Sequence, residues 1–152
     1  LPSENVLNRG TGFLYPDEEV TLTIPSTADK VISVGAYDAL TFSYASFSGR
    51  GYTREYNMVK PDIVAPAVNI VSASNNGGIT VKSGTSMAAP FVTGAAALLM
   101  EWGIVNGNDR FLYGEKVKAY LIRGARPLSS RKEQPNPLAG YGALCLSRSF
   151  PD

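Results

Sequence analysis

The sequence predicts an α/β fold in which a sheet with some parallel pairing packs against long buried helices. Two observations lead to this fold class. Short runs rich in β-branched residues occupy the first half of the chain, and a long apolar segment, residues 87–100, follows them. Strands followed by buried helices are typical of α/β domains. The 152 residues are enough for one domain with its own hydrophobic core.

The strands are predicted in chain order from alternation and turn residues. Residues 19–24 alternate β-branched and other side chains and end at Pro25, which predicts a strand of an antiparallel sheet. A mostly apolar strand is predicted for residues 30–37, because continuous apolar runs suit a strand covered on both faces. Further short strands are predicted at residues 44–48, 62–65 and 140–146, with a turn at residues 49–51.

A hairpin and two helices complete the predicted elements. Residues 69–73 and 79–82 flank the turn sequence NNGG and predict a β-hairpin. A helix is expected from Ser86 to about Trp102, ending at Gly103. A second helix is expected at residues 114–123, with one apolar stripe at Val117, Tyr120 and Leu121 and a stop at Gly124, and residues 129–137 are expected to form a loop.

The charge and hydropathy exclude several kinds of partner. Fourteen basic and 13 acidic residues leave a net charge of +1, which gives no general attraction to nucleic acid or to anionic membranes. The apolar segment at residues 87–100 is too short for a membrane span and is expected to be a buried core helix. The chain starts with Leu-Pro-Ser and has no signal-peptide pattern, so we expect this start to be an internal point of a longer protein.

Ser86 stands where a polar loop becomes the long helix, and two roles fit that position. Serine is a favoured N-cap, which accepts a hydrogen bond from the second or third helical N–H group. Serine can also be a nucleophile, with nearby N–H groups holding the oxyanion that forms. Pro90 fits both roles, because an early helical position does not need its missing N–H group. Local chemistry alone leaves the choice open.

The order of residues around Ser86 resembles a known motif. The run GTSMAAP, residues 84–90, followed by Gly94, resembles the nucleophile motif of the subtilisin-like serine proteases, or subtilases. Four further segments resemble that family in the same order, and the resemblance extends over roughly residues 26–146. These segments are VISVGA at residues 31–36, Phe47-Ser48, KPDIVAP at residues 60–66 and GYGA at residues 140–143.

The resemblance implies a fold and roles for individual residues. It implies that residues 26–152 are the C-terminal part of a subtilisin-like catalytic domain with a parallel sheet. Ser86 would be the nucleophile, its own backbone N–H one oxyanion donor, and Thr85 and Met87 would line the site. In the family the triad Asp and His precede the Ser, and this chain contains no histidine. We interpret Asp62 as a strand-end residue that makes backbone hydrogen bonds.

The first 25 residues have no counterpart in small subtilisins and are predicted to be the end of an inserted β element. FLYP at residues 13–16 and TLTIPS at residues 21–26 resemble the exit of the jelly-roll insert of the clostridial spore-germination (Csp) subtilases. This resemblance would imply an extracytoplasmic or spore-associated location, which the sequence itself does not determine. Two departures from the family are Phe91, where a structural histidine is common, and Ala67, where a glycine is usual after Ala-Pro.

The predicted function is that of a fragment of a serine endopeptidase. It would hydrolyse peptide bonds through an acyl-enzyme on Ser86, with the triad Asp and His in a missing N-terminal part. That part and a peptide or protein substrate are the expected partners, and the fragment alone is expected to be inactive. No cofactor is required for this chemistry; structural calcium is common in the family, but no acidic cluster specifies a site. The alternative is a non-catalytic pseudoprotease that acts as a binding or regulatory module.

Two lysine-based alternatives are weaker. SSRK at residues 129–132 matches the S-x-x-K pattern of serine–lysine hydrolases but lies in a proline-rich loop, without the accompanying motifs of that class. Lys82 precedes Ser86 by four residues and could act as a base, but we interpret it as a solvated strand end.

Overall fold

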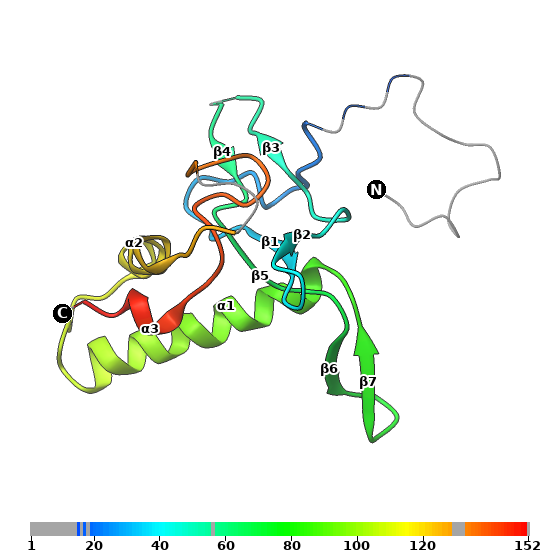
Figure 1. The fold of residues 1–152 in the computed structure, drawn as a ribbon. Coiled ribbons are helices and arrows are strands. Elements are labelled where there is room, and N and C mark those ends of the chain that lie inside the picture. The colour runs from blue at the N-terminus through cyan, green and yellow to red at the C-terminus, as the bar shows by residue number, and fades with distance from the viewer. Residues whose placement is uncertain (1–14, 16, 18, 56, 129–132, 152) are drawn as a thin grey trace.

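The computed structural model describes residues 15, 17, 19–55, 57–128 and 133–151. Within these residues a small central sheet packs against the long helix α1 (Thr85–Met100). Two further helices, α2 (Gly114–Gly124) and α3 (Leu146–Ser149), lie toward the C-terminal end of α1. The hairpin that precedes α1 projects away from the sheet, as Figure 1 shows.

The central sheet has the order β2-β1-β5 and contains the expected parallel pair. Strand β1 (Val34–Asp38) pairs in parallel with β5 (Ile63–Pro66), so that Gly35 faces Val64, and β2 (Ser43–Tyr44) pairs antiparallel with the other edge of β1. A side chain at Gly35 would meet Pro61 at 2.7 Å, so glycine allows this close approach. The predicted α/β class with parallel pairing is therefore confirmed.

Two antiparallel hairpins flank the sheet. The predicted hairpin is confirmed as β6 (Ile70–Ala73) and β7 (Ile79–Lys82), and its turn is closed by a hydrogen bond from Ser74 N–H to Gly78 C=O. The second hairpin, β3 (Gly51–Tyr52) and β4 (Val59–Lys60), was not predicted from the sequence. Each of its strands is only two residues long, too short to produce a recognisable alternation.

Two predicted strands are wrong, and a third, at residues 44–48, is a strand only at Tyr44, since the chain turns at residues 46–47. In residues 19–24 only Val20 makes an antiparallel bridge, to Gly51, and the chain then turns near Pro25. In residues 140–146 only isolated bridges form, and α3 begins at Leu146. Gly140 and Gly142 have φ angles of 56° and 118°, which an extended strand does not allow.

The long helix α1 buries one face and continues beyond its predicted end. Its buried residues contact β1 and β5 and lie at helical spacing, namely Ala88, Val92, Ala95 and Leu99. The expected stop at Gly103 is wrong, because α1 passes directly into a π-helical turn, η2 (Glu101–Val105). Gly103 is buried inside this turn, where an added Cβ would lie 2.7 Å from the Leu112 side chain.

The joined helix reaches a length that the sequence analysis did not anticipate. Residues 85–105 form 21 continuous helical residues that include an 18-residue window with a mean hydropathy of 1.5, enough by length and composition to cross a membrane. The packing of one face against β1 and β5 is, however, the arrangement of a core helix. Elsewhere on the helix surface, large apolar side chains remain 42–49% exposed, namely Phe91, Leu98, Met100 and Ile104.

A buried ion cluster centred on Asp62 fixes the start of β5. The Asp62 carboxylate lies 2.7 Å from Lys60 Nζ and 3.0 Å from Lys118 Nζ, and it accepts a hydrogen bond from the Ser33 N–H group at 2.7 Å. Lys60 and Asp62 are 2% and 6% exposed. Burial lowers the pKa of Lys60, and the hydrogen bond to Asp62 opposes that shift. Asp62 is thus more than the backbone hydrogen-bond acceptor that the sequence analysis assigned.

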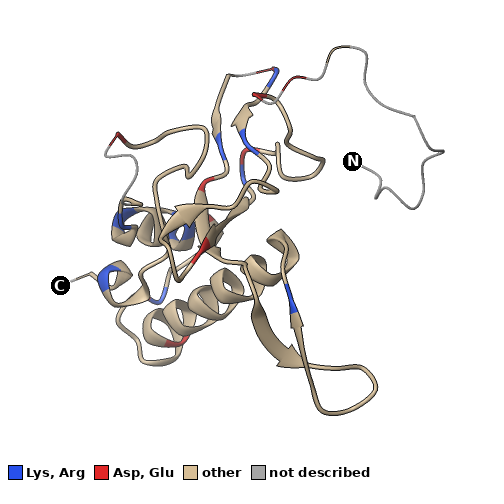
Figure 2. Ribbon diagram, turned by 45° about the vertical axis from the view of Figure 1, so that its right-hand side comes forward, with Lys and Arg blue, Asp and Glu red and all other residues tan. Residues whose placement is uncertain are grey.

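Lys118 extends this cluster to α2. Its ammonium group also donates to the carbonyl groups of Asp29 and Val31, at 2.8 and 3.1 Å. The segment that leads into β1 is therefore fastened to both β5 and α2. The other charges are spread over the fold, as Figure 2 shows.

Replacement of Asp62 by Asn should destabilise the fold strongly. The change leaves the buried ammonium group of Lys60 and the partly buried one of Lys118 without their carboxylate, and breaking a buried pair typically costs about 3–5 kcal/mol. Urea unfolding followed by the fluorescence of Trp102, the only tryptophan, measures the effect. The matched control is Glu115→Gln, which removes an exposed pair with Lys30 at 3.5 Å and should cost less than about 1 kcal/mol. Equal losses for the two variants would contradict the role of the cluster.

The 152-residue chain by itself should associate in solution, because the outer face of α1 is apolar and β2 and β5 present incomplete edges. Exposed apolar patches and open strand edges favour association. Sedimentation analysis over a range of concentrations should show a shift to larger species, and Leu98→Ser should weaken it. A monodisperse monomer at every concentration would contradict this prediction.

Candidate active site

The loop before α1 is tied to the carboxyl end of β5. The Gly84 N–H group donates to the Ala67 carbonyl at 2.9 Å, and the Asn69 N–H group donates to Ser83 Oγ at 2.9 Å. Ala67 directly follows β5 and also donates to the Tyr37 carbonyl of β1 at 3.0 Å. Because the carboxyl edge of a parallel sheet is where α/β folds commonly bind ligands, these contacts place the start of α1 at a favourable edge.

Ser86 lies inside the first turn of α1, and the capping role considered from the sequence is wrong. The N-cap residue is Gly84, with φ 148° and ψ 160°, and it makes no side-chain cap hydrogen bond. The Ser86 side chain is exposed, and its hydroxyl has no hydrogen-bond partner among the described residues. The N–H groups of this first turn have no partner within the helix, and the helix dipole there favours a negative charge.

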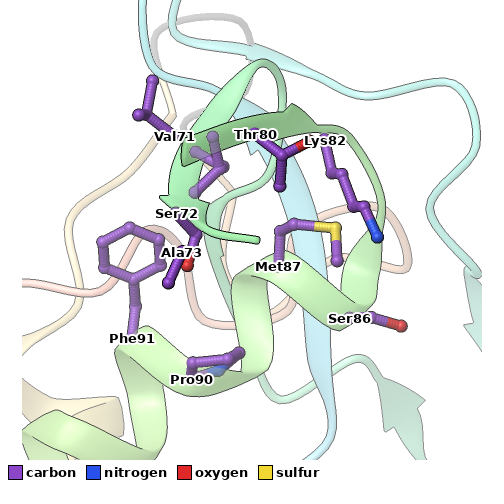
Figure 3. A pocket seen from close by; sticks show the side chains of 10 residues that line it. Val71, Ser72, Ala73, Thr80, Lys82, Ser86, Met87, Pro90 and Phe91 are labelled. Atoms are coloured by element: carbon purple, nitrogen blue, oxygen red, sulfur yellow. The ribbon is translucent and has the colours of Figure 1, made fainter. Parts of the chain in front are cut away.

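A cavity of about 480 Å³ opens beside Ser86, between the hairpin β6–β7 and the first two turns of α1. Its lining is mostly apolar, with three hydroxyl groups and one charged side chain, Lys82. The lining residues are Ile70, Val71, Ser72, Ala73, Thr80, Lys82, Ser86, Met87, Pro90 and Phe91. Figure 3 shows their side chains.

The structure places the two other predicted site residues on different sides of Ser86. Met87 lines the same cavity as Ser86. Thr85 lines a second, more polar cavity of about 500 Å³, together with residues of the segments around Ser26, Ser33 and Ser48. Roles for Thr85 and Met87 in catalysis remain predictions.

The general base that Ser86 would need is not supplied by a histidine of this chain, because the sequence contains none. The ion cluster of Asp62 is engaged with Lys60 and Lys118 and is not part of either cavity lining. Within the described part of the chain, no three potential metal ligands of the His, Cys, Asp or Glu type come together.

Sequence reasoning missed the involvement of Lys82 with this cavity. Lys82 was interpreted as a solvated strand end, and its side chain is indeed exposed, but it also forms part of the cavity wall. The signal in the sequence was the hairpin itself: β7 ends at Lys82 only four residues before Ser86, so its last side chain has to lie near the start of α1. The SSRK segment, residues 129–132, lies outside the described residues.

Comparisons with known proteins agree with the motif around Ser86. The Subtilase family, Peptidase_S8, matches residues 14–143. Serine protease AprX of Bacillus subtilis (strain 168) is 35% identical over 156 aligned positions, which cover 90% of this chain and 33% of AprX.

Solved structures give the same result. The CspB protease of Clostridium perfringens is 51% identical, with a TM-score of 0.88 over 95% of this chain and 30% of that one. The self-cleaved protease domain of PatA is 31% identical, with a TM-score of 0.65 over 84% of this chain and 43% of that one. The chain thus spans about a third of the length of AprX and CspB. By sequence profile, identity and fold, it belongs to the subtilase family of serine proteases.

Proposed function

We propose that this chain is the serine-bearing part of a longer subtilase endopeptidase in which Ser86 is the nucleophile. The observation that carries the proposal is the position of Ser86 within the GTSMAAP motif. It lies on the first turn of α1, with an exposed hydroxyl that makes no hydrogen bond among the described residues and that borders a cavity. A serine that only capped the helix would have its hydroxyl engaged with the backbone.

The proposed reaction is acyl transfer to Ser86. The Ser86 Oγ attacks the carbonyl carbon of the scissile peptide bond while its proton passes to a histidine base. The tetrahedral oxyanion is held by N–H groups, among them that of Ser86 itself, and the start of α1 supplies a favourable dipole. The C–N bond then breaks, the leaving amine takes the proton from the histidine, and water hydrolyses the ester to restore Ser86.

The histidine and its orienting aspartate would come from a part of the protein outside these 152 residues. A serine hydroxyl without a base is a weak nucleophile at neutral pH, so the chain alone should be inactive. This chain spans only about a third of AprX and of CspB, and the rest of those proteins is long enough to include such a part. We therefore propose that this N-terminal part and a peptide or protein are the partners of the chain. No cofactor is needed for the chemistry, and the assignment of residues 1–25 to an inserted β element remains a proposal.

The likeness to CspB supports a Csp-type protease, and with it the role in spore germination and the spore-associated location that the resemblance implies. A non-catalytic binding role on the same scaffold is the alternative function. The chain itself contains no histidine, so Ser86 would be unused if the rest of the protein also lacked the base.

Ser86→Ala should abolish both peptide hydrolysis and covalent labelling by a fluorophosphonate in the complete protein. The wild-type complete protein should label once, on Ser86, as mass spectrometry of the labelled peptide would show. The isolated 152-residue chain should hydrolyse no peptide. Ser147→Ala changes an exposed serine next to Cys145, remote from the cavity, and should label normally. An unlabelled wild-type protein would favour the binding role.

Gly84→Ala should slow the labelling of Ser86 by about tenfold or more. The φ angle of 148° at Gly84 is one that side-chain-bearing residues rarely adopt, and enforcing it costs about 1–3 kcal/mol, so α1 would begin in a shifted position. Small misplacements of a reacting group reduce rates strongly. The matched control is Gly77→Ala, which places the same side chain at φ 85° in the turn of the β6–β7 hairpin. Equal labelling rates for the two variants would show that the Gly84 conformation does not position Ser86.

A further inference from the structure

The cavity beside Ser86 contains a single charged side chain. Lys82 is the only ionisable residue among the ten that line it. It is also the only charged residue between Asp62 and Glu101 in the sequence. No other charge on the hairpin or on α1 before Glu101 therefore adds to its field or opposes it. Nothing acidic contributes to the cavity wall.

The ammonium group of Lys82 is unpaired, unlike those of several other lysines. Within the described part of the chain Lys82 has no ion pair and no hydrogen bond, and its side chain is exposed. Four other lysines each contact a carboxylate, namely Lys30, Lys60, Lys116 and Lys118. Lys82 is therefore a cation at the edge of a largely apolar cavity, and no carboxylate among the described residues neutralises it.

The geometry brings this cation close to the proposed reacting atom. Three residues separate Lys82 from Ser86, so that even a fully extended link would keep their Cα atoms within about 14 Å. Figure 3 shows the end of the Lys82 side chain and the Ser86 hydroxyl on the same side of Met87, the side away from Ala73 and Phe91. An extended peptide advances about 3.3 Å per residue. A substrate residue near the bond attacked by Ser86 therefore falls within reach of Lys82.

We infer that Lys82 makes the protease favour peptides that carry an acidic side chain within three residues of the scissile bond. The carboxylate of such a residue would accept a charge-assisted hydrogen bond from the ammonium group. Apolar side chains of the lining, such as Val71, Met87 and Phe91, would contact the aliphatic part of the same residue. This inference rests on the proposed function, since it concerns the substrate of Ser86.

The test compares matched peptides with the complete protein. Fluorogenic peptides with Glu or Gln at each of the three positions on either side of the cleaved bond differ only in charge. At one position or more, the Glu peptide should have a kcat/KM about 1.5- to 5-fold higher, the range expected for an exposed ion pair. This preference should decrease when the salt concentration rises from 0.1 M to 1 M, because the screening length falls from about 10 Å to about 3 Å.

Variants of Lys82 locate the cause. Lys82→Met should reduce the Glu-to-Gln ratio to about one, Lys82→Arg should keep it, and Lys82→Glu should reverse it so that a Lys peptide is preferred to Gln. Arg54→Glu makes the same change in net charge at an exposed site on the β3–β4 hairpin and should leave the ratio unchanged.

The outcomes separate this inference from the function on which it depends. Equal rates for Glu and Gln peptides at all positions, in a protein whose Ser86 still reacts with the fluorophosphonate, would overturn the role of Lys82 and leave the nucleophile assignment intact. A preference that persists in Lys82→Met would also overturn it. A complete protein that neither labels nor cleaves any peptide would refute both.

Discussion

The carboxylate of Asp62 is the interaction on which the arrangement of the sheet depends. It brings together the end of β4 through Lys60, helix α2 through Lys118, and the backbone before β1 through Ser33. All of these contacts lie at the amino end of the parallel pair β1–β5. The opposite end of the same pair carries Ala67 and, through it, the start of α1. The fold thus keeps its strong buried charges at one edge of the sheet and leaves the other edge for Ser86.

This separation has a physical reason. A buried ion pair is rigid and costly to disturb, since removing either partner leaves an uncompensated charge. Near the proposed nucleophile the opposite condition holds: the Ser86 hydroxyl and the Lys82 ammonium have no partner among the described residues and are available to a ligand. The backbone link from Gly84 to Ala67 fastens the start of α1 to the carboxyl end of β5, so that the position of Ser86 depends on the register of β5.

The elements that the sequence predicted well have strong local signals. The hairpin β6–β7 follows from its glycine-containing turn, β5 from its apolar run between two prolines, and α2 from its apolar stripe. The failures occur where tertiary contacts override local pattern. Residues 140–146 have the composition of a strand, but positive φ angles at Gly140 and Gly142 bend the chain. The close approach at residue 140 requires glycine, because an added Cβ would lie 2.0 Å from the Pro61 carbonyl. Sequence periodicity carries no information about such an approach.

For the site, the motif located Ser86, while only the structure showed that Gly84 is the N-cap and that Lys82 borders the cavity. Both depend on where a turn directs the chain, which residue order alone does not specify. Asp62 was similarly underestimated, because its two lysine partners come from separate parts of the sequence and one of them, Lys118, belongs to α2. The assignment of residues 1–25 to an inserted β element and the expectation that no cofactor is required stay predictions.

The π-helical turn at the end of α1 lets a single helix serve two different layers. A wider turn contains an extra residue relative to α-helical spacing, and each residue of a helix rotates the following side chains by about 100° around the axis. Up to Leu99 the buried stripe faces the sheet, whereas Trp102 contacts the rings of Tyr120 and Phe150, with centroid separations of 6.4 and 5.8 Å. The π-helical turn rotates the apolar face of the helix from the strands toward α2 and the C-terminal segment, and the helix continues without a break. Removal of one residue from it would turn Trp102 away from both rings while leaving the serine end of the helix in its original register.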